Sequence, residues 1–169
     1  MKNMRINKTV YKNSSQQDYN IIIDVRTPLE FKEDHIPNSI NHPVLTNKQR
    51  HEIGITYKEN SFLAKKVGAS KISLNISKII NKIKFDKKQR ILIYCWRGGL
   101  RSLSLYLVLK QIGYDVTLLN GGYKNYRRFV VNFFETSCDK YKFNQIMGVT
   151  GVGKTLFIKE LSKSYQVID

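Results

Sequence analysis

The chain has 169 residues, of which 41% are hydrophobic and 25% charged, the composition of a soluble globular protein with room for one domain and a smaller remainder. No stretch of about 18 uncharged apolar residues occurs, so the sequence predicts no membrane span. No apolar core follows the first five residues, so we expect no secretory signal. Two cysteines in such a chain indicate a reducing, cytoplasmic setting without a structural disulfide.

The charge balance is strongly basic, with 29 Lys and Arg against 13 Asp and Glu and a net charge of +16. Such a charge attracts polyanions, and nucleic acids in particular through counterion release. A genome rich in A and T, which overuses Lys on solvated faces, would give the same balance. The charge therefore favours a polyanionic partner without identifying one.

Strands and helices are predicted to alternate along the chain. Residues 1–19 form a polar lead-in, and the β-branched run at 21–25 predicts a strand buried on both faces. Thr27 can cap the next helix, with Pro28 at its first position and Glu30 in its first turn. The remaining elements are a short strand near 8–11, a turn at 35–39, helices within 47–84, a buried strand at 90–94, an apolar helix ended by Gly113, a strand at 116–119, a turn at 120–122 and a helix over 123–134.

This alternation predicts an α/β domain built on a parallel sheet flanked by helices, which we place at residues 20–136. Residues 137–169 are interpreted as a linker and the start of a second α/β domain. A strand at 143–147 is expected to open that second domain, and a helix at 156–162 to follow it.

The loop after the second buried strand carries the clearest chemistry. The strand ends at Cys95 and the next helix starts near Ser102. Gly98 and Gly99 can turn backbone N–H groups inward without a Cβ clash, and the helix N-terminus adds its dipole. Together they form a concave nest for an anion, which favours the reactive thiolate of Cys95. Arg101 can bind an oxyanion with its guanidinium fork.

Less reactive interpretations exist for two of these residues. Cys95 could be a buried core cysteine at a strand end, although packing gives no reason for the glycines and arginines around it. Trp96 could be a hydrophobic lid or a platform on which a base stacks. The predicted site comprises Cys95 as nucleophile and Trp96, Arg97, Gly98, Gly99, Leu100, Arg101 and Ser102 as the anion-binding and donor-binding loop.

Five segments resemble, in order and spacing, the motifs of rhodanese domains. They are Asp24-Val25-Arg26, Glu30-Phe31, His35-Ile36-Pro37-Asn38-Ser39-Ile40-Asn41, the Cys95 loop and Leu119-Asn120-Gly121-Gly122-Tyr123. Within that superfamily, the segment from Tyr94 to Ser102 is similar to the active loop of the bacterial tRNA 2-selenouridine synthases. The helical insert around Gly54-Ile55-Thr56-Tyr57-Lys58 also looks like theirs, and the resemblance covers residues 20–169.

The resemblance implies a particular reaction. That family replaces sulfur by selenium in the wobble 2-thiouridine of tRNA, with selenophosphate as donor and a geranylated intermediate made from geranyl diphosphate. Cys95 would then carry the selenium as a perselenide, and Arg97 and Arg101 would hold the donor's phosphate. No tightly bound cofactor is implied. Asp24, Arg26 and His35 match rhodanese motif positions and are expected to brace the loop rather than react.

Two other enzyme functions fit the same loop. One is a generic rhodanese-type sulfurtransferase. The other is a phosphatase, because five residues separate Cys95 from Arg101, one more than in the usual sulfurtransferase loop. This Cys-x5-Arg spacing is that of protein tyrosine phosphatases, in which a wider loop seats a tetrahedral phosphate. Tyr94 stands where those enzymes usually have His.

A second motif lies near the C-terminal end. The segment Gly148-Val149-Thr150-Gly151-Val152-Gly153-Lys154-Thr155 matches the P-loop pattern at every fixed position. Its amides would cradle a diphosphate, Lys154 would reach the outer oxygens and Thr155 could ligate Mg²⁺. The phosphate-binding residues predicted here are Gly148, Gly151, Gly153, Lys154 and Thr155.

The P-loop domain looks incomplete. Such a domain needs more strands to bury the first one, and an acid for the metal further along the chain. Only residues 165–169 remain, which resemble the start of a further strand. We therefore expect a truncated gene product, half of a split enzyme whose second chain supplies the rest, a fragment, or a non-catalytic remnant. Residues 142–169 should pack loosely unless a partner covers them. His42 and His51 lack metal-ligand spacing with either cysteine, so no metal site is predicted.

Overall fold

The computed structural model describes residues 6–12, 15–137, 140, 142, 144–165 and 167. The chain divides into two compact units, Met1–Phe133 and Phe134–Asp169. The first contains a five-stranded sheet and its covering helices, and the second contains the glycine-rich motif and a short helix. No helix in the described ranges is long and apolar enough to cross a membrane.

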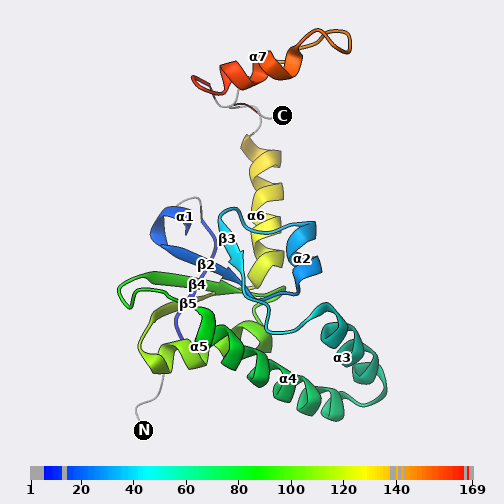
Figure 1. Cartoon of the computed structure of the whole chain (residues 1–169), viewed down its shortest axis with the longest axis vertical. Coiled ribbons are helices and arrows are strands. Elements are labelled where there is room, and N and C mark those ends of the chain that lie inside the picture. The colour runs from blue at the N-terminus through cyan, green and yellow to red at the C-terminus, as the bar shows by residue number, and fades with distance from the viewer. Residues whose placement is uncertain are drawn as a thin grey trace. The chain divides into compact units, whose positions relative to one another are not determined.

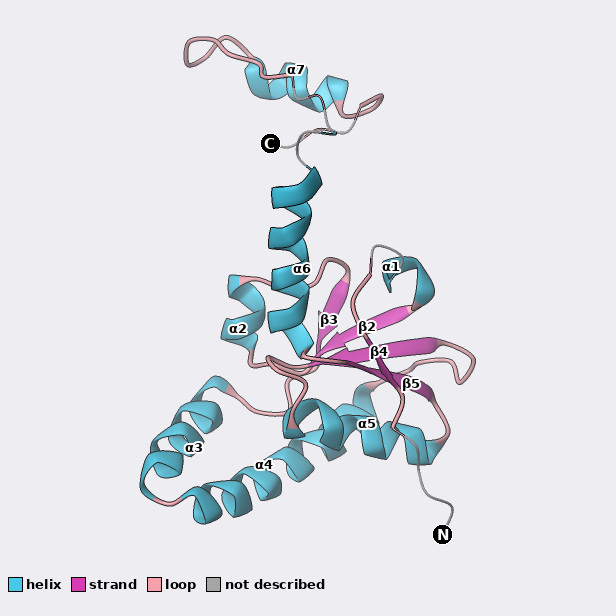
Figure 2. Ribbon diagram, turned by 180° about the vertical axis from the view of Figure 1, so that it is seen from behind, coloured by secondary structure: helices cyan, strands magenta, loops and turns pink. Residues whose placement is uncertain are grey.

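The sheet of the first unit is entirely parallel, with strand order β1-β5-β4-β2-β3 (Figure 2). Parallel strands all end at one edge of a sheet, so the loops that follow β2, β4 and β5 meet there. The predicted α/β class with a parallel sheet is confirmed. The strands are β1 (Lys8–Thr9), β2 (Ile21–Asp24), β3 (Ser39–Asn41), β4 (Arg90–Tyr94) and β5 (Asp115–Leu119).

Each face of the sheet is covered by its own helices (Figures 1 and 2). Alternate residues of the central strands enter two separate cores: Ile91 and Ile93 pack toward α4 and α5, while Leu92 and Tyr94 pack toward α6. Side chains buried on both faces explain why these strands have continuous apolar sequences. The helices are α1 (Ser15–Asp18), α2 (Pro28–Glu33), α3 (Asn47–Glu59), α4 (Ser61–Lys82), α5 (Leu100–Ile112) and α6 (Gly122–Ser137).

The helix boundaries follow local signals in the sequence. Thr27 forms a capping box with Glu30 at the start of α2, as predicted, and Pro28 is its first residue. Gly113 ends α5 in the left-handed conformation at φ 105°, which also agrees with the prediction. Asn60 ends α3 and caps α4, so these two helices form a hairpin.

Two strands differ from the sequence prediction. Strand β1 is shorter than expected, and it pairs with β5, so the sheet begins within the segment interpreted as a lead-in. Strand β3 lies at the other edge of the sheet, where the sequence predicts only a turn at 35–39. Both strands are only two or three residues long, and each has a single neighbouring strand. They are too short to show a sequence pattern of their own, so their extended conformation follows from pairing with the sheet.

The second unit contains α7 (Lys154–Leu161). The prediction of a strand at 143–147 is wrong for its described part, because residues 144–149 have no regular secondary structure. A strand needs a neighbour to bond its backbone groups, and the described part of this unit supplies none. The further strand expected at 165–169 lies mostly outside the described residues.

Apolar side chains of the second unit are exposed, including those of Met147, Leu156 and Phe157 at 80%, 74% and 56%. Segments with so few buried apolar contacts open at low free energy. We expect native-state hydrogen exchange to show the α7 amides exchanging far faster than those of β4, whose residues 91–94 are fully buried. Equal protection of α7 and β4 would contradict this expectation.

Candidate active site around Cys95

Cys95 follows β4 directly and is only 3% exposed. Its Sγ accepts a hydrogen bond from the Gly99 amide at 3.3 Å and another from the Ser102 hydroxyl at 3.2 Å. Gly98, which directly precedes Gly99, is in the left-handed region at φ 70°, and this lets the loop fold back over the sulfur. Two hydrogen-bond donors therefore point at this one sulfur.

Ser102 is completely buried and has two possible acceptors. Its hydroxyl oxygen lies 3.2 Å from Cys95 Sγ and 3.1 Å from the Gly99 carbonyl oxygen. A hydroxyl carries one proton, so it can donate to the sulfur when Cys95 is a thiolate and to the carbonyl when Cys95 is a thiol. Ser102 can therefore donate a hydrogen bond whether Cys95 is a thiol or a thiolate.

The cysteine loop is docked on the N-terminus of α6. The carbonyl oxygen of Cys95 accepts from the Tyr123 amide at 2.9 Å, and that of Trp96 accepts from the Lys124 amide at 3.0 Å. A Cβ on Gly122 would lie 2.1 Å from the Cys95 carbonyl oxygen, so only glycine fits there. This close approach explains why glycine occupies position 122 in the segment from Asn120 to Tyr123.

Arg101 is held by Glu30 of α2. Its two terminal nitrogens donate to the two carboxylate oxygens of Glu30 at 2.8 and 3.3 Å. Burial alone would raise the pKa of Glu30, but the hydrogen bonds and charge of Arg101, together with the Thr27 amide and hydroxyl, lower it below its ordinary value. Glu30 thus fixes Arg101 at the rim of the loop, a role that its place in the motif did not reveal.

Asp24 and Arg26 form a buried ion pair below the loop. The Arg26 side chain donates to both carboxylate oxygens at 2.7–3.1 Å, and its Nη2 also donates to the Asp34 carbonyl at 2.6 Å. Burial opposes its charge, yet the hydrogen bond and charge of Asp24 raise the pKa of Arg26 above its ordinary value. Its guanidinium lies 4.0 Å from the centre of the Tyr123 ring. These contacts join β2, α2 and α6 and do not reach Cys95 Sγ.

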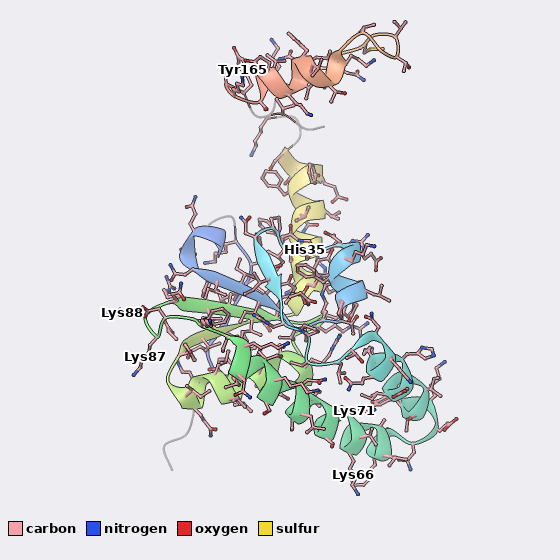
Figure 3. All side chains as sticks on the ribbon, viewed as in Figure 1. His35, Lys66, Lys71, Lys87, Lys88 and Tyr165 are labelled. Carbon is pink, nitrogen blue, oxygen red and sulfur yellow. The ribbon has the colours of Figure 1, made fainter. Side chains whose placement is uncertain are left out.

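Tyr94 and His35 also have structural partners. The Tyr94 hydroxyl accepts from the Ile36 amide at 3.1 Å and lies 3.0 Å from the Ser39 hydroxyl. Burial and the charge of Asp24 raise the pKa of Tyr94 above its ordinary value, so it stays protonated. His35, labelled in Figure 3, stacks on Phe31 and bonds its carbonyl at 2.9 Å. Its described contacts are therefore with α2.

An open groove of about 500 Å³ leads to Cys95. The predicted residues Trp96, Arg97, Gly99, Leu100 and Arg101 line it, so the structure brings most of the loop together around the sulfur. The groove also contains Arg50 of α3, which the sequence analysis did not identify. No local motif marks Arg50, because its place depends on the packing of the α3–α4 hairpin.

The glycine-rich motif of the second unit forms a loop before α7. Gly151 and Gly153 have φ values of 89° and 84°, conformations that favour glycine. The Lys154 ammonium donates to the carbonyl oxygens of Gly148 and Val149 at 2.8 Å each, so it folds over its own loop. Thr155 is the one described residue to which the motif assigns Mg²⁺.

The described residues do not complete a site for Mg²⁺ at that loop. No group of three or more His, Cys, Asp or Glu side chains in the described ranges could hold a metal ion. One hydroxyl is too few protein ligands to assign the ion.

Comparison with known proteins defines the class. Residues 7–128 match the rhodanese-like domain family. The chain also resembles the crystal structure of an N-terminal domain from Clostridium difficile 630, at 37% identity and a TM-score of 0.64, over 73% of this chain and 99% of that domain. The chain therefore belongs to the rhodanese-like domain family.

Curated relatives show a more specific similarity within this family. The chain is 36% identical to a tRNA 2-selenouridine synthase of Nitrosomonas eutropha (strain DSM 101675 / C91 / Nm57), over 88% of this chain and 39% of that protein. It is 35% identical to a tRNA 2-selenouridine synthase of Psychromonas ingrahamii (strain DSM 17664 / CCUG 51855 / 37), over 86% of this chain and 40% of that protein. The resemblance drawn from the Cys95 loop is thus confirmed, and the chain spans about two fifths of the length of these relatives.

The docking of the loop on α6 can be tested at Gly122. In Gly122→Ala the methyl group would overlap the Cys95 carbonyl, and the left-handed φ of 58° would add its own strain. We expect a loss of about 2–5 kcal/mol in the free energy of unfolding, measured by urea denaturation. The control is Gly99→Ala, whose Cβ would meet no atom within 4 Å. Equal stability of the two variants would contradict the account.

The Glu30–Arg101 pair predicts a pH dependence. The lowered pKa of Glu30 means that its ionised form stabilises the fold above its ordinary pKa of 4.5, and that this contribution is lost as the pH falls through the folded value. Since the Glu30 side chain is 27% exposed, Glu30→Gln should cost roughly 1 kcal/mol at neutral pH. The difference should shrink below pH 4.5 in denaturation curves. A deficit that is constant with pH would show that the charge is not the cause.

Proposed function

We propose that this chain carries a selenium or sulfur atom on Cys95 and delivers it to the wobble 2-thiouridine of tRNA. The observation that carries the proposal is the environment of Cys95 Sγ: two hydrogen-bond donors and a groove with three arginines. The names of the curated relatives support the same reaction. The chain spans about two fifths of the length of these relatives, so their complete reaction is assigned to this chain only as a proposal.

The loading step is simplest with a sulfane donor such as thiosulfate. The Cys95 thiolate attacks the outer sulfur, the S–S bond of the donor breaks, and sulfite leaves with the electron pair of that bond. Cys95 is left as a persulfide anion, so atoms and electrons balance. The Gly99 amide and the Ser102 hydroxyl, which bond the thiolate, lie beside the new charge.

The anionic donor is held by groups on this chain. The arginines that line the groove supply positive charge where the leaving anion departs. Selenophosphate, the donor that the resemblance implies, would bind at the same arginines through its phosphate group. Arg101 is already oriented by Glu30, so it meets the donor without the cost of ordering a free side chain.

The glycine-rich loop before α7 is proposed to bind a diphosphate, and the resemblance implies that this is the diphosphate of geranyl diphosphate. Gly151 and Gly153 support this because their left-handed backbone lets amides turn toward an anion. Lys154 would have to leave the carbonyls of Gly148 and Val149 to reach it. A second chain that supplies further strands would cover the exposed apolar side chains of α7.

Incubation of the chain with thiosulfate tests the proposal. Intact-protein mass spectrometry should show one added sulfur, and peptide mapping should place it on Cys95. Cys95→Ser should abolish the gain, because a hydroxyl at that position cannot hold a sulfane sulfur under these conditions.

The matched control is Cys138→Ser, which removes the other cysteine of the chain and should load as the wild type does. A wild-type chain that never gains sulfur or selenium on Cys95 would contradict the proposal. Hydrolysis of an aryl phosphate with burst kinetics and without loading would instead establish the phosphatase alternative.

A further inference from the structure

The groove at Cys95 contains two arginines that no described carboxylate pairs. Of its three arginines, Arg101 is neutralised by Glu30. Arg50 and Arg97 are exposed, and neither has an ion pair within the described ranges. Among the residues that the structure describes, no carboxylate lines the groove. We infer that the groove binds a segment of single-stranded nucleic acid, with Arg50 and Arg97 on its phosphates and a base on Trp96.

The position of Arg50 is set by the packing of the α3–α4 hairpin. The Asn75 amide of α4 donates to Gln49 at 2.8 Å and to the Val44 carbonyl at 3.0 Å, which ties the start of α3 to α4. A Cβ on Gly54 would lie 3.5 Å from Arg50 Nη1, so the guanidinium rests against the next turn of its own helix. Arg50 therefore belongs to an ordered wall of the groove.

Trp96 supplies the aromatic component. Its ring packs on that of Tyr123, with centroids 5.5 Å apart, and Trp96 also lines the groove. Bases of single strands stack on such rings while basic residues follow the backbone, and stacking contributes about 1–3 kcal/mol per base. Phosphate alone would need no aromatic residue, so the combination favours a nucleotide over a free anion.

The size of the groove agrees with such a ligand, since about 500 Å³ lies within the range of small-molecule sites. Because it is open, the strand can continue beyond the nucleotide that is bound. A base on Trp96 lies beside the residue that precedes it, the sulfur-bearing Cys95. The inference rests on the proposed function and deepens it, because it assigns Arg50 to recognition of the RNA backbone next to the reacting base.

The test uses the fact that Trp96 is the only tryptophan of the chain. Its fluorescence is followed while a short oligouridylate is added, at several salt concentrations. We expect saturable quenching, because a stacked base quenches the indole. Arg50→Gln should weaken binding about 5–10-fold at low salt and should reduce the slope of log K against log salt by about 0.7, the value for one phosphate contact in a single strand.

The control variant is Lys88→Gln, which removes the same charge in the turn before β4, at the opposite end of that strand from Cys95 (Figure 3). It should bind as the wild type does. Absence of quenching, or equal loss in the two variants, would overturn the inference. Quenching abolished by inorganic phosphate at the same concentration as the oligonucleotide's phosphates would also overturn it, because the groove would then be a simple phosphate site.

Loading of Cys95 with sulfur is measured on the same wild-type preparation. A chain that loads but does not bind the oligonucleotide contradicts only the inference. A chain that binds it through Arg50 but never loads contradicts the proposed function and leaves the nucleotide groove in place.

Discussion

The site depends on the close approach of Gly122 to the carbonyl oxygen of Cys95, where no side chain fits. That approach allows the amides of Tyr123 and Lys124 to hold the carbonyls of Cys95 and Trp96. Because β4 and β5 are neighbours in a parallel sheet, the loops after them meet at one edge. Cys95 is thus positioned by two segments that are distant in sequence, and its backbone carbonyl is bonded to the first turn of α6.

The charges around this loop divide into two groups. Asp24 and Arg26 are buried and bind each other, and removing either would leave an uncompensated charge that costs about 3–5 kcal/mol. Their role is to join β2, α2 and α6 below the loop. Arg50 and Arg97 are exposed in the groove, and neither has an ion pair among the residues that the structure describes. The buried pair therefore fixes the geometry below the loop, while the two exposed arginines are the ones to which the proposal assigns the ligand.

Much of the site could be predicted because its residues lie close together in the sequence. The strand before Cys95 and the Thr27 cap are local patterns, and the structure contains both. Arg50 could not be predicted, since it reaches the groove only through the packing of two helices. Strand β3 exists only because β2 is beside it. The strand expected at 143–147 does not form in its described part. Its sequence pattern is suitable, but the described residues offer it no neighbouring strand.

The central claim is that Cys95 carries a chalcogen atom in a loop that stays docked on α6. A crystal structure of the chain after treatment with thiosulfate tests it most directly. The account predicts one additional atom bonded to Cys95 Sγ, pointing into the groove lined by Arg97 and Trp96, with the bond from the Tyr123 amide to the Cys95 carbonyl retained. An unmodified Cys95, or a modified one whose loop has left α6, would contradict it.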